Sequence, residues 1–110
     1  MANTFKLKTK ANVGVTTVGI YTAPAATTTV VIGITLSNTS GSGVNVGVAV
    51  SRTSDTKDDV SLLKNAPIPQ GSSLEFMGGN KVVLETNDQI NIDSDTNNSV
   101  DAALTIMEIT

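Results

Sequence analysis

The chain has 110 residues, a formal net charge of −3, and neither cysteine nor histidine. These absences exclude disulfides, zinc sites built on Cys or His, and the Ser-His-Asp and Cys-His nucleophile systems, so we expect no enzymatic activity and no cofactor. An acidic balance, one tyrosine, two phenylalanines and apolar runs far below the roughly 20 residues of a membrane helix predict no nucleic-acid and no membrane partner.

The N-terminal residues 1–12 alternate apolar and basic side chains. Phe5 and Leu7 share one parity, and the other parity carries the lysines Lys6, Lys8 and Lys10. Lysines along an outermost strand discourage wrong pairing, so the pattern predicts an edge strand. The alternative is an arm that packs on a neighbouring subunit, with the lysines as candidate contacts to an acidic partner surface. The segment lacks the apolar stretch of a secretion signal, so we expect no export.

Residues 13–24 predict a second strand, which Pro24 ends. The clearest pattern follows in residues 27–40, TTTVVIGITLSNTS, where apolar residues recur at every second position across residues 30–36. Such alternation places the apolar set on one face of a sheet. Residues 44–51, VNVGVAVS, repeat the pattern after a Gly/Ser/Asn loop, so the two runs predict an antiparallel hairpin.

Residues 52–59 are polar and mix both charges, because Arg52 and Lys57 lie among acidic residues. Such a mixture predicts an exposed loop, since surface ion pairs are common and weak. The alternative is a contact with a neighbouring subunit, or an ion site shared between subunits, formed by the acidic residues Asp55, Asp58 and Asp59.

A segment with two prolines and several turn residues, LLKNAPIPQGSSLEFMGG, begins at Leu62. Each proline fixes φ at about −65°, removes a backbone donor and biases the residue before it to an extended conformation. Gly71 permits a turn after them. The segment therefore predicts a stiff crossing between two sheets, with an exposed strip whose candidate partner contacts are Pro67, Ile68 and Pro69.

Five further strands are expected in residues 60–64, 74–77, 81–85, 89–93 and 100–110, separated by turns. The chain then holds about eight or nine short strands, with turn signals about every 8–12 residues. We predict a single domain over residues 1–110, folded as an all-β antiparallel sandwich that is jelly-roll-like or immunoglobulin-like. The expected core is Val30, Ile32, Ile34, Leu36, Val46, Val48, Val83, Ile90, Ile92, Leu104 and Ile106.

The loop DSDTNNSVD is the strongest candidate for a metal site, and it remains a weak one. Its oxygen-bearing residues Asp93, Asp95 and Asn97 match the D-x-D-x-N opening of a calcium loop. The match then fails, because Asn98 replaces the glycine of the sixth position and Leu104 replaces the glutamate of the twelfth. The favoured interpretation is a solvated turn stabilised by Asx capping.

Residues 21–110 resemble small virion structural proteins of tailed bacteriophages, particularly phages of marine bacteria and cyanobacteria. The resemblance lies in YTAPAATTTVVIGITLSNTS, VNVGVAV, LLKNAPIPQGSSLEFMGGNKVVLETNDQI and the closing LTIMEIT. These are structural residues, so the resemblance brings no catalytic residues with it.

What the resemblance implies is a capsid decoration, or cement, protein that binds across capsomer joints. Its partners would be the major capsid protein or other virion proteins, and it would be a homo-oligomer, with a trimer favoured. It would be made in the host cytoplasm and lie on the capsid exterior. The alternative is a neck, tail or fibre component that binds host surface carbohydrate, which the shortage of aromatic side chains disfavours.

Overall fold

The computed structural model describes residues 2–52, 58–76 and 81–110. No helix in these ranges is long and apolar enough to cross a bilayer. The described residues form nine strands: β1 (Asn3–Val13), β2 (Val18–Thr22), β3 (Thr28–Asn38), β4 (Val44–Ser51), β5 (Val60–Ile68), β6 (Ser73–Phe76), β7 (Val82–Leu84), β8 (Gln89–Ser94) and β9 (Val100–Ile109).

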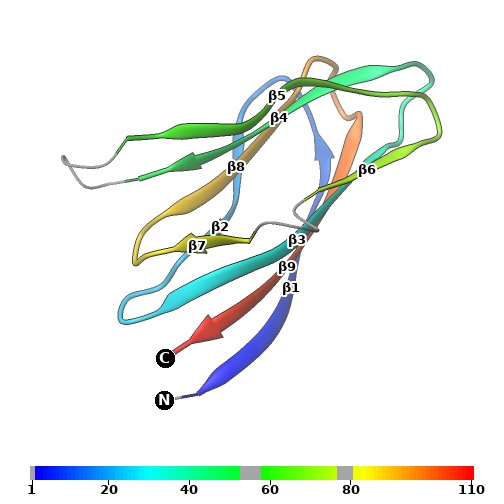
Figure 1. Cartoon of the computed structure of the whole chain (residues 1–110). Helices are drawn as coiled ribbons and strands as arrows, with labels where there is room; N and C mark the ends of the chain where they lie inside the picture. The colour runs from blue at the N-terminus through cyan, green and yellow to red at the C-terminus, as the bar shows by residue number, and fades with distance from the viewer. Residues whose placement is uncertain (1, 53–57, 77–80) are drawn as a thin grey trace.

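The strands form two antiparallel sheets that lie as two layers (Figure 1). The first sheet has the order β1-β9-β3-β6, with β7 also paired to β3, and the second has the order β2-β8-β4-β5. Only the β4–β5 and β6–β7 connections stay within one sheet; the other connections cross between them. Repeated crossing between two packed sheets is the arrangement of a jelly roll. The predicted all-β sandwich is thus confirmed, in its jelly-roll form.

The core lies between the sheets and follows the alternation of the sequence. In β9, every second side chain from Val100 to Glu108 is buried. The same period-2 burial appears in β4 and β8, as expected for strands with one covered face. Most of the predicted core is buried: Ile34, Leu36, Val46, Val48, Ile90, Ile92, Leu104 and Ile106.

A bulge in β3 makes two of the predicted core positions wrong. Val31 is opposite Ile106 in β9, whereas Gly33 is opposite Thr105, so Ile32 is an extra residue in β3. An extra residue reverses the parity of the strand. Val31 is therefore fully buried, while Val30 and Ile32 are only half-buried.

Val83 is a third incorrect core assignment. Its side chain is 56% exposed, while the next residue, Leu84, is fully buried. β7 is a short strand that pairs with the edge of β3 facing away from β9, and Val83 lies opposite Val30. Both residues therefore belong to the outer face of the first sheet.

The predicted hairpin between the two valine- and isoleucine-rich runs is also wrong, because β3 and β4 lie in different sheets. β4 instead pairs with β5 and β8. Residues 39–43 form a crossing whose shape depends on Asn38: its side-chain amide donates to the Ser42 carbonyl at 2.8 Å and to the Ile68 carbonyl at 2.9 Å.

The expected second strand is shorter than residues 13–24, since β2 begins at Val18 and Val13 belongs to β1.

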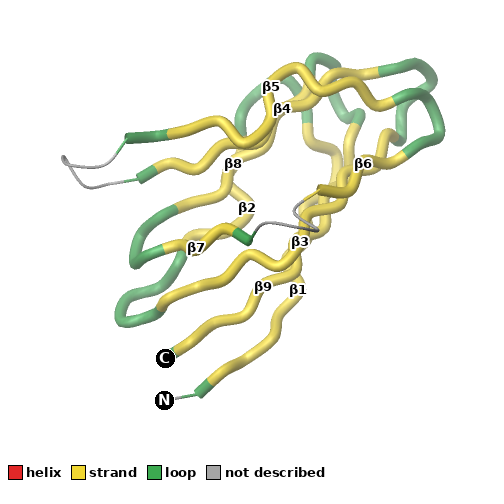
Figure 2. The backbone as a smooth tube through the Cα atoms, viewed as in Figure 1, coloured by secondary structure: helices red, strands yellow, loops and turns green. Residues whose placement is uncertain are grey.

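β1 forms one edge of the first sheet and pairs with β9 alone. The pairing runs without a break over residues 3–10. Beyond it, Ala2 and Thr110 exchange two backbone hydrogen bonds of 3.0 Å, so the two chain ends lie side by side (Figure 2).

The bulge in β3 predicts different costs for truncating two isoleucines two residues apart. Ile34→Ala should reduce the unfolding free energy by about 2–5 kcal/mol, because it leaves a cavity in the core. Ile32→Ala should cost less than half as much, because Ile32 is half-buried. Urea denaturation of both variants measures the difference, and equal or reversed costs would contradict the bulged register.

Candidate docking face

An apolar row crosses the outer face of the first sheet. Phe5 lies opposite Met107, Met107 opposite Val30, and Val30 opposite Val83. Directly opposite residues of antiparallel strands point to the same face. We call Phe5, Met107, Val30 and Val83 the outer row. Its two ends are open to solvent, since Phe5 is 69% exposed and Val83 56% exposed.

Leu7 extends this apolar surface along β1 and is 63% exposed. Farther along the same face, a shallow depression of about 270 Å³ is lined by Thr9, Lys10, Thr35 and other small or polar residues. Contiguous exposed apolar side chains on a monomer mark interaction surfaces more often than scattered ones do. The exposed face of β1, from Phe5 to Thr9, is thus the strongest candidate for contact with another protein.

The predicted lysine contacts lie on the opposite parity of β1. Lys6 is compensated, because its Nζ lies 2.8 Å from Oε1 of Glu108. Lys8 and Lys10 form no ion pair with any of the described residues. Lys8 nevertheless helps to lower the pKa of Glu108 through its charge, and both lysines place positive charge beside the free edge of β1.

A buried polar cluster ties this strand pair to the second sheet. The Tyr21 hydroxyl, from β2, lies 2.6 Å from Oε2 of Glu108 in β9 and 2.7 Å from Oγ1 of Thr29 in β3. Burial and the Glu108 carboxylate raise the pKa of Tyr21 to about 12. The Lys6 ammonium, followed by the Tyr21 hydroxyl, lowers the pKa of Glu108. The cluster fixes the sheets against each other at the end where the chain termini lie.

Sequence reasoning missed this cluster, because nothing local connects its members. Tyr21 and Glu108 are 87 residues apart, and Glu108 has the pattern of an ordinary sheet-face residue near the end of a strand. Its only signal is parity: Glu108 occupies the buried parity of β9, together with Leu104 and Ile106. A carboxylate at a buried position requires a partner.

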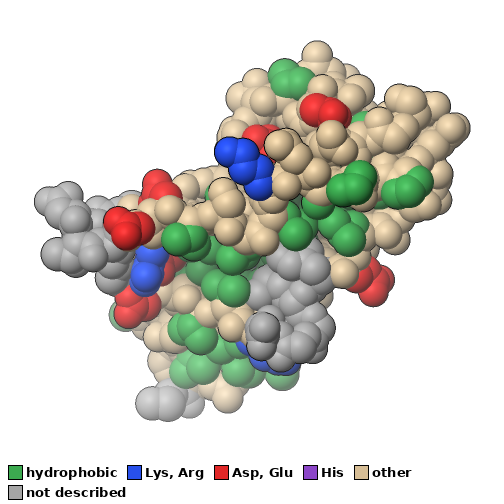
Figure 3. Space-filling model, turned by 45° about the horizontal axis from the view of Figure 1, so that its top comes forward, with side chains coloured by type: hydrophobic (Ala, Val, Ile, Leu, Met, Phe, Trp, Pro, Cys, Tyr) green, Lys and Arg blue, Asp and Glu red, His purple; other side chains and the backbone are tan. Residues whose placement is uncertain are grey.

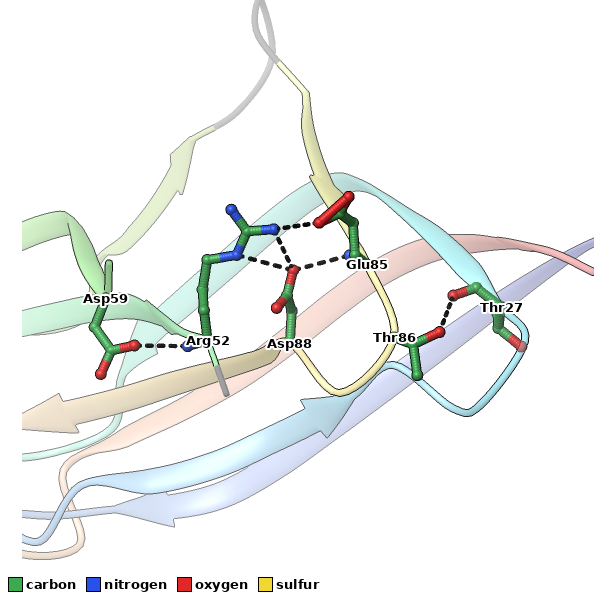
Figure 4. A network of polar contacts seen from close by, with 6 residues as sticks. All are labelled: Thr27, Arg52, Asp59, Glu85, Thr86 and Asp88. Atoms are coloured by element: carbon green, nitrogen blue, oxygen red, sulfur yellow. Dashed lines mark hydrogen bonds and ion pairs between the residues drawn. The ribbon is translucent and has the colours of Figure 1, made fainter. Parts of the chain in front are cut away.

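A second polar network joins the end of β4 to the turn between β7 and β8 (Figure 4). Arg52, just after β4, donates from Nε and Nη2 to Oδ2 of the buried Asp88, at 3.2 and 3.0 Å, and from Nη2 to Oε1 of Glu85 at 2.8 Å. The hydrogen bonds to Asp88 chiefly raise the pKa of Arg52. The Asp88 carboxylate also accepts the backbone N–H of Glu85 at 2.9 Å. Arg52 thus holds the turn between β7 and β8 against the end of β4.

The sequence predicts an exposed loop at the charged residues 52–59, but Arg52 belongs to this network. Arg52 is engaged across the sandwich with Asp88 and Glu85, and its backbone N–H donates to Asp59 at 2.6 Å. Asp58 is exposed, as is Asp59. Asp55 and Lys57 lie outside the described residues, so the predicted ion site shared between subunits stays a prediction.

Two of the three candidate calcium residues accept hydrogen bonds from residues far away in the sequence. Asp95 accepts the backbone N–H of Asn45 at 3.1 Å, and Asp93 accepts the Thr17 hydroxyl at 3.4 Å. Asn97 is exposed in the following loop. In residues 2–52, 58–76 and 81–110 no three acidic side chains are placed to hold a metal ion. The Asx-capping interpretation and the weak calcium candidate Asp93, Asp95 and Asn97 therefore both stay predictions.

The three candidate contacts in the proline segment divide into two kinds. Ile68 is 1% exposed and belongs to the core, so its side chain is inaccessible to a partner and that assignment is wrong. Pro67 and Pro69 are exposed. Pro67 lies in β5, an edge strand of the second sheet, which is where sheets tolerate proline. The segment then leads from β5 in the second sheet to β6 in the first.

The second sheet offers a weaker alternative site on its outer face. A shallow depression of about 190 Å³ is lined by Thr17, Gly47, Lys64, Asn91, Asp93 and their neighbours, with no aromatic side chain among them. Sugar recognition commonly uses aromatic stacking on an amphipathic ring. On the face drawn in Figure 3 the basic side chains are few and separated, unlike the concentrated basic patch of a nucleic-acid binder.

Comparisons with protein-family models, curated proteins and solved structures gave no match. On the surface of the chain, the described residues bring together an apolar row, two lysines that form no ion pair and an unpaired strand edge. Each of these features serves binding to another protein.

The polar cluster predicts an unusual titration of Tyr21, which is the sole tyrosine. The ultraviolet absorbance of its phenolate should show a midpoint at about pH 12 in the folded protein, against 10.0 for the ordinary phenol. Because the folded pKa is raised, the contribution of Tyr21 to stability is complete below pH 10 and is lost as pH rises toward 12.

Glu108→Gln is the matched variant for this titration. It keeps a hydrogen-bonding side chain but removes the negative charge, so the Tyr21 midpoint should move down while burial keeps it above 10. The same measurement in concentrated urea should give the ordinary value. A native midpoint near 10 would contradict the cluster.

Proposed function

We propose that the chain is a non-enzymatic virion structural protein of a tailed bacteriophage, which decorates the outside of the capsid. The observation that carries this proposal is the exposed apolar face of β1, at one edge of the first sheet. A cement protein needs a rigid body and a surface that binds the shell, and it needs no reactive groups. The assignment to a virion comes from the sequence, in which residues 21–110 resemble phage virion proteins.

The jelly-roll order is compatible with this role but does not carry it. Jelly rolls occur in viral capsid and lectin domains, and one fold hosts many functions. The outer face contributes more to the argument. β1 is held in continuous register against the central strand β9 over residues 3–10, so the geometry of this face is fixed before binding. A preformed face loses little conformational freedom on docking.

Decoration also fits the modest size of the face. Copies that bind a repeating shell gain avidity when they are linked, so each contact can be weak. We propose a homo-oligomer, with a trimer favoured, because a trimer matches the threefold joints between capsomers and forms cyclic interfaces. The proposed partner is the major capsid protein, or another virion protein, and the proposed location is the capsid exterior.

Heads of the encoding phage, assembled without this protein, provide the test. Purified wild-type protein should pellet with them. Phe5→Ser should weaken binding by about 10–100-fold, since burying a phenylalanine contributes about 1.5–3 kcal/mol. Its melting temperature should stay close to wild type, because Phe5 is 69% exposed.

Val60→Ser is the matched control, because Val60 is 50% exposed and begins β5 in the second sheet. It should pellet like wild type. Wild-type protein that stays in the supernatant would overturn capsid decoration. Wild-type binding that Phe5→Ser leaves unchanged would show that the outer face of β1 is not the docking surface.

A further inference from the structure

The free edge of β1 presents a defined set of backbone groups. Ala2 and Thr110 exchange both of their backbone hydrogen bonds, each 3.0 Å long. In an antiparallel pair, hydrogen-bonded and non-hydrogen-bonded positions alternate, and the register continues unbroken to Lys10. The positions whose N–H and C=O groups point away from β9, toward the free edge, are therefore Asn3, Phe5, Leu7 and Thr9.

These same positions carry the exposed apolar side chains of the outer face. Phe5 and Leu7 offer both an apolar side chain and an unpaired pair of backbone groups. Lys8 and Lys10 lie on the opposite face of the strand, and neither forms an ion pair with a described residue. The edge thus has one apolar side and one positive side.

The length of the free edge is limited at its C-terminal end. The register shifts between Lys10 and Val13, and Asn12 has a left-handed φ of 59°. The Asn12 backbone N–H donates to Oδ1 of Asp101 at 3.0 Å. A regular added strand can therefore pair along residues 3–10 and no farther.

We propose that β1 binds an extended segment of a partner protein as an added strand, and that this segment alternates apolar and acidic residues. Its backbone would pair with the outward groups of β1. Its apolar residues would lie beside Phe5 and Leu7, and its acidic residues beside Lys8 and Lys10. The identity of the partner as a virion protein rests on the proposed function; the chemistry of the segment rests on the edge alone.

A second copy of β1 is a poor occupant of this edge in the registers that pair the most residues. Outward-facing positions must lie opposite one another in an antiparallel pair. A register that pairs Leu7 with Leu7 of the other copy places Lys6 opposite Lys8, and one that pairs Phe5 with Leu7 places Lys6 opposite Lys6. Like charges directly opposite each other are destabilising, and edge lysines oppose such self-pairing. The same lysines favour an acidic strand.

An eight-residue peptide in which glutamate alternates with valine is the probe, and the same peptide with lysine in place of glutamate is its control. Fluorescence anisotropy should detect binding of the glutamate peptide to the full-length protein and none of the lysine peptide. Hydrogen exchange should show new protection at the amides of Asn3, Phe5, Leu7 and Thr9. Binding should weaken as salt is raised, because part of it is electrostatic.

Two variants separate backbone pairing from charge. Leu7→Pro removes an outward donor that β9 does not use, and it should weaken glutamate-peptide binding at least tenfold, whereas Leu7→Ile should bind like wild type. The double variant Lys8→Glu with Lys10→Glu should reverse the preference, binding the lysine peptide and rejecting the glutamate peptide. This second variant keeps the test decisive if the proline destabilises β1.

No binding of the glutamate peptide at about 1 mM, a level at which even weak strand addition is populated, would overturn the inference. So would equal binding of the two peptides, protection on β5 instead of β1, or dimerisation through β1. If wild-type protein still pelleted with phage heads in any of these cases, capsid decoration would stand without strand addition. If the peptide bound but the protein did not bind phage heads, strand addition at β1 would stand and the virion partner would be ruled out.

Discussion

The structure depends on the closure of two sheets over one apolar layer. Six of the eight connections between the nine described strands carry the chain from one sheet to the other, so few neighbouring strands in the sequence can stabilise each other alone. β9, the last strand, is central: it pairs with β1 on one side and β3 on the other, and its Leu104 and Ile106 are fully buried. The fold is complete only when the C-terminal strand is in place. Such non-local pairing is typical of slowly folding β proteins.

The same constraint creates the free edge. Because β9 takes the inner position, β1 is left outermost, with one side paired and the other open. The Lys6–Glu108–Tyr21 cluster then fixes this edge to the second sheet through groups that are all satisfied. A buried carboxylate held by a lysine and a tyrosine gives the strand pair a single geometry. The docking face is consequently rigid, although it lies at the margin of the molecule.

Much of the fold was predictable, and its failures have identifiable causes. Alternation located the strands and most of the core, because successive side chains of a strand point to opposite faces and the buried face therefore shows as every second residue. Pairing is not local, so the loop at residues 39–43 resembled a hairpin turn although the Asn38 side chain shapes it into a crossing. The bulge at Ile32 was invisible for a related reason: it is defined only by the register with β9.

The site was predictable only in part. The lysines of β1 and the apolar residues between them were evident from the sequence, but the outer row was not. Met107, Val30 and Val83 join Phe5 solely through the registers of three strand pairs. Ile68 was misassigned because a residue between two prolines appears exposed, whereas its side chain points into the core. Tyr21 and Glu108 required knowledge of which strands face one another.

The most direct measurement is a cryo-electron microscopy reconstruction of the intact virion at a resolution that shows strands. We expect density for this jelly roll on the outer surface of the shell at capsomer joints, with β1 and the outer row facing the capsid and an extra strand along residues 3–10. Density confined to the unique vertex, or a docked molecule whose β1 edge faces solvent, would contradict it.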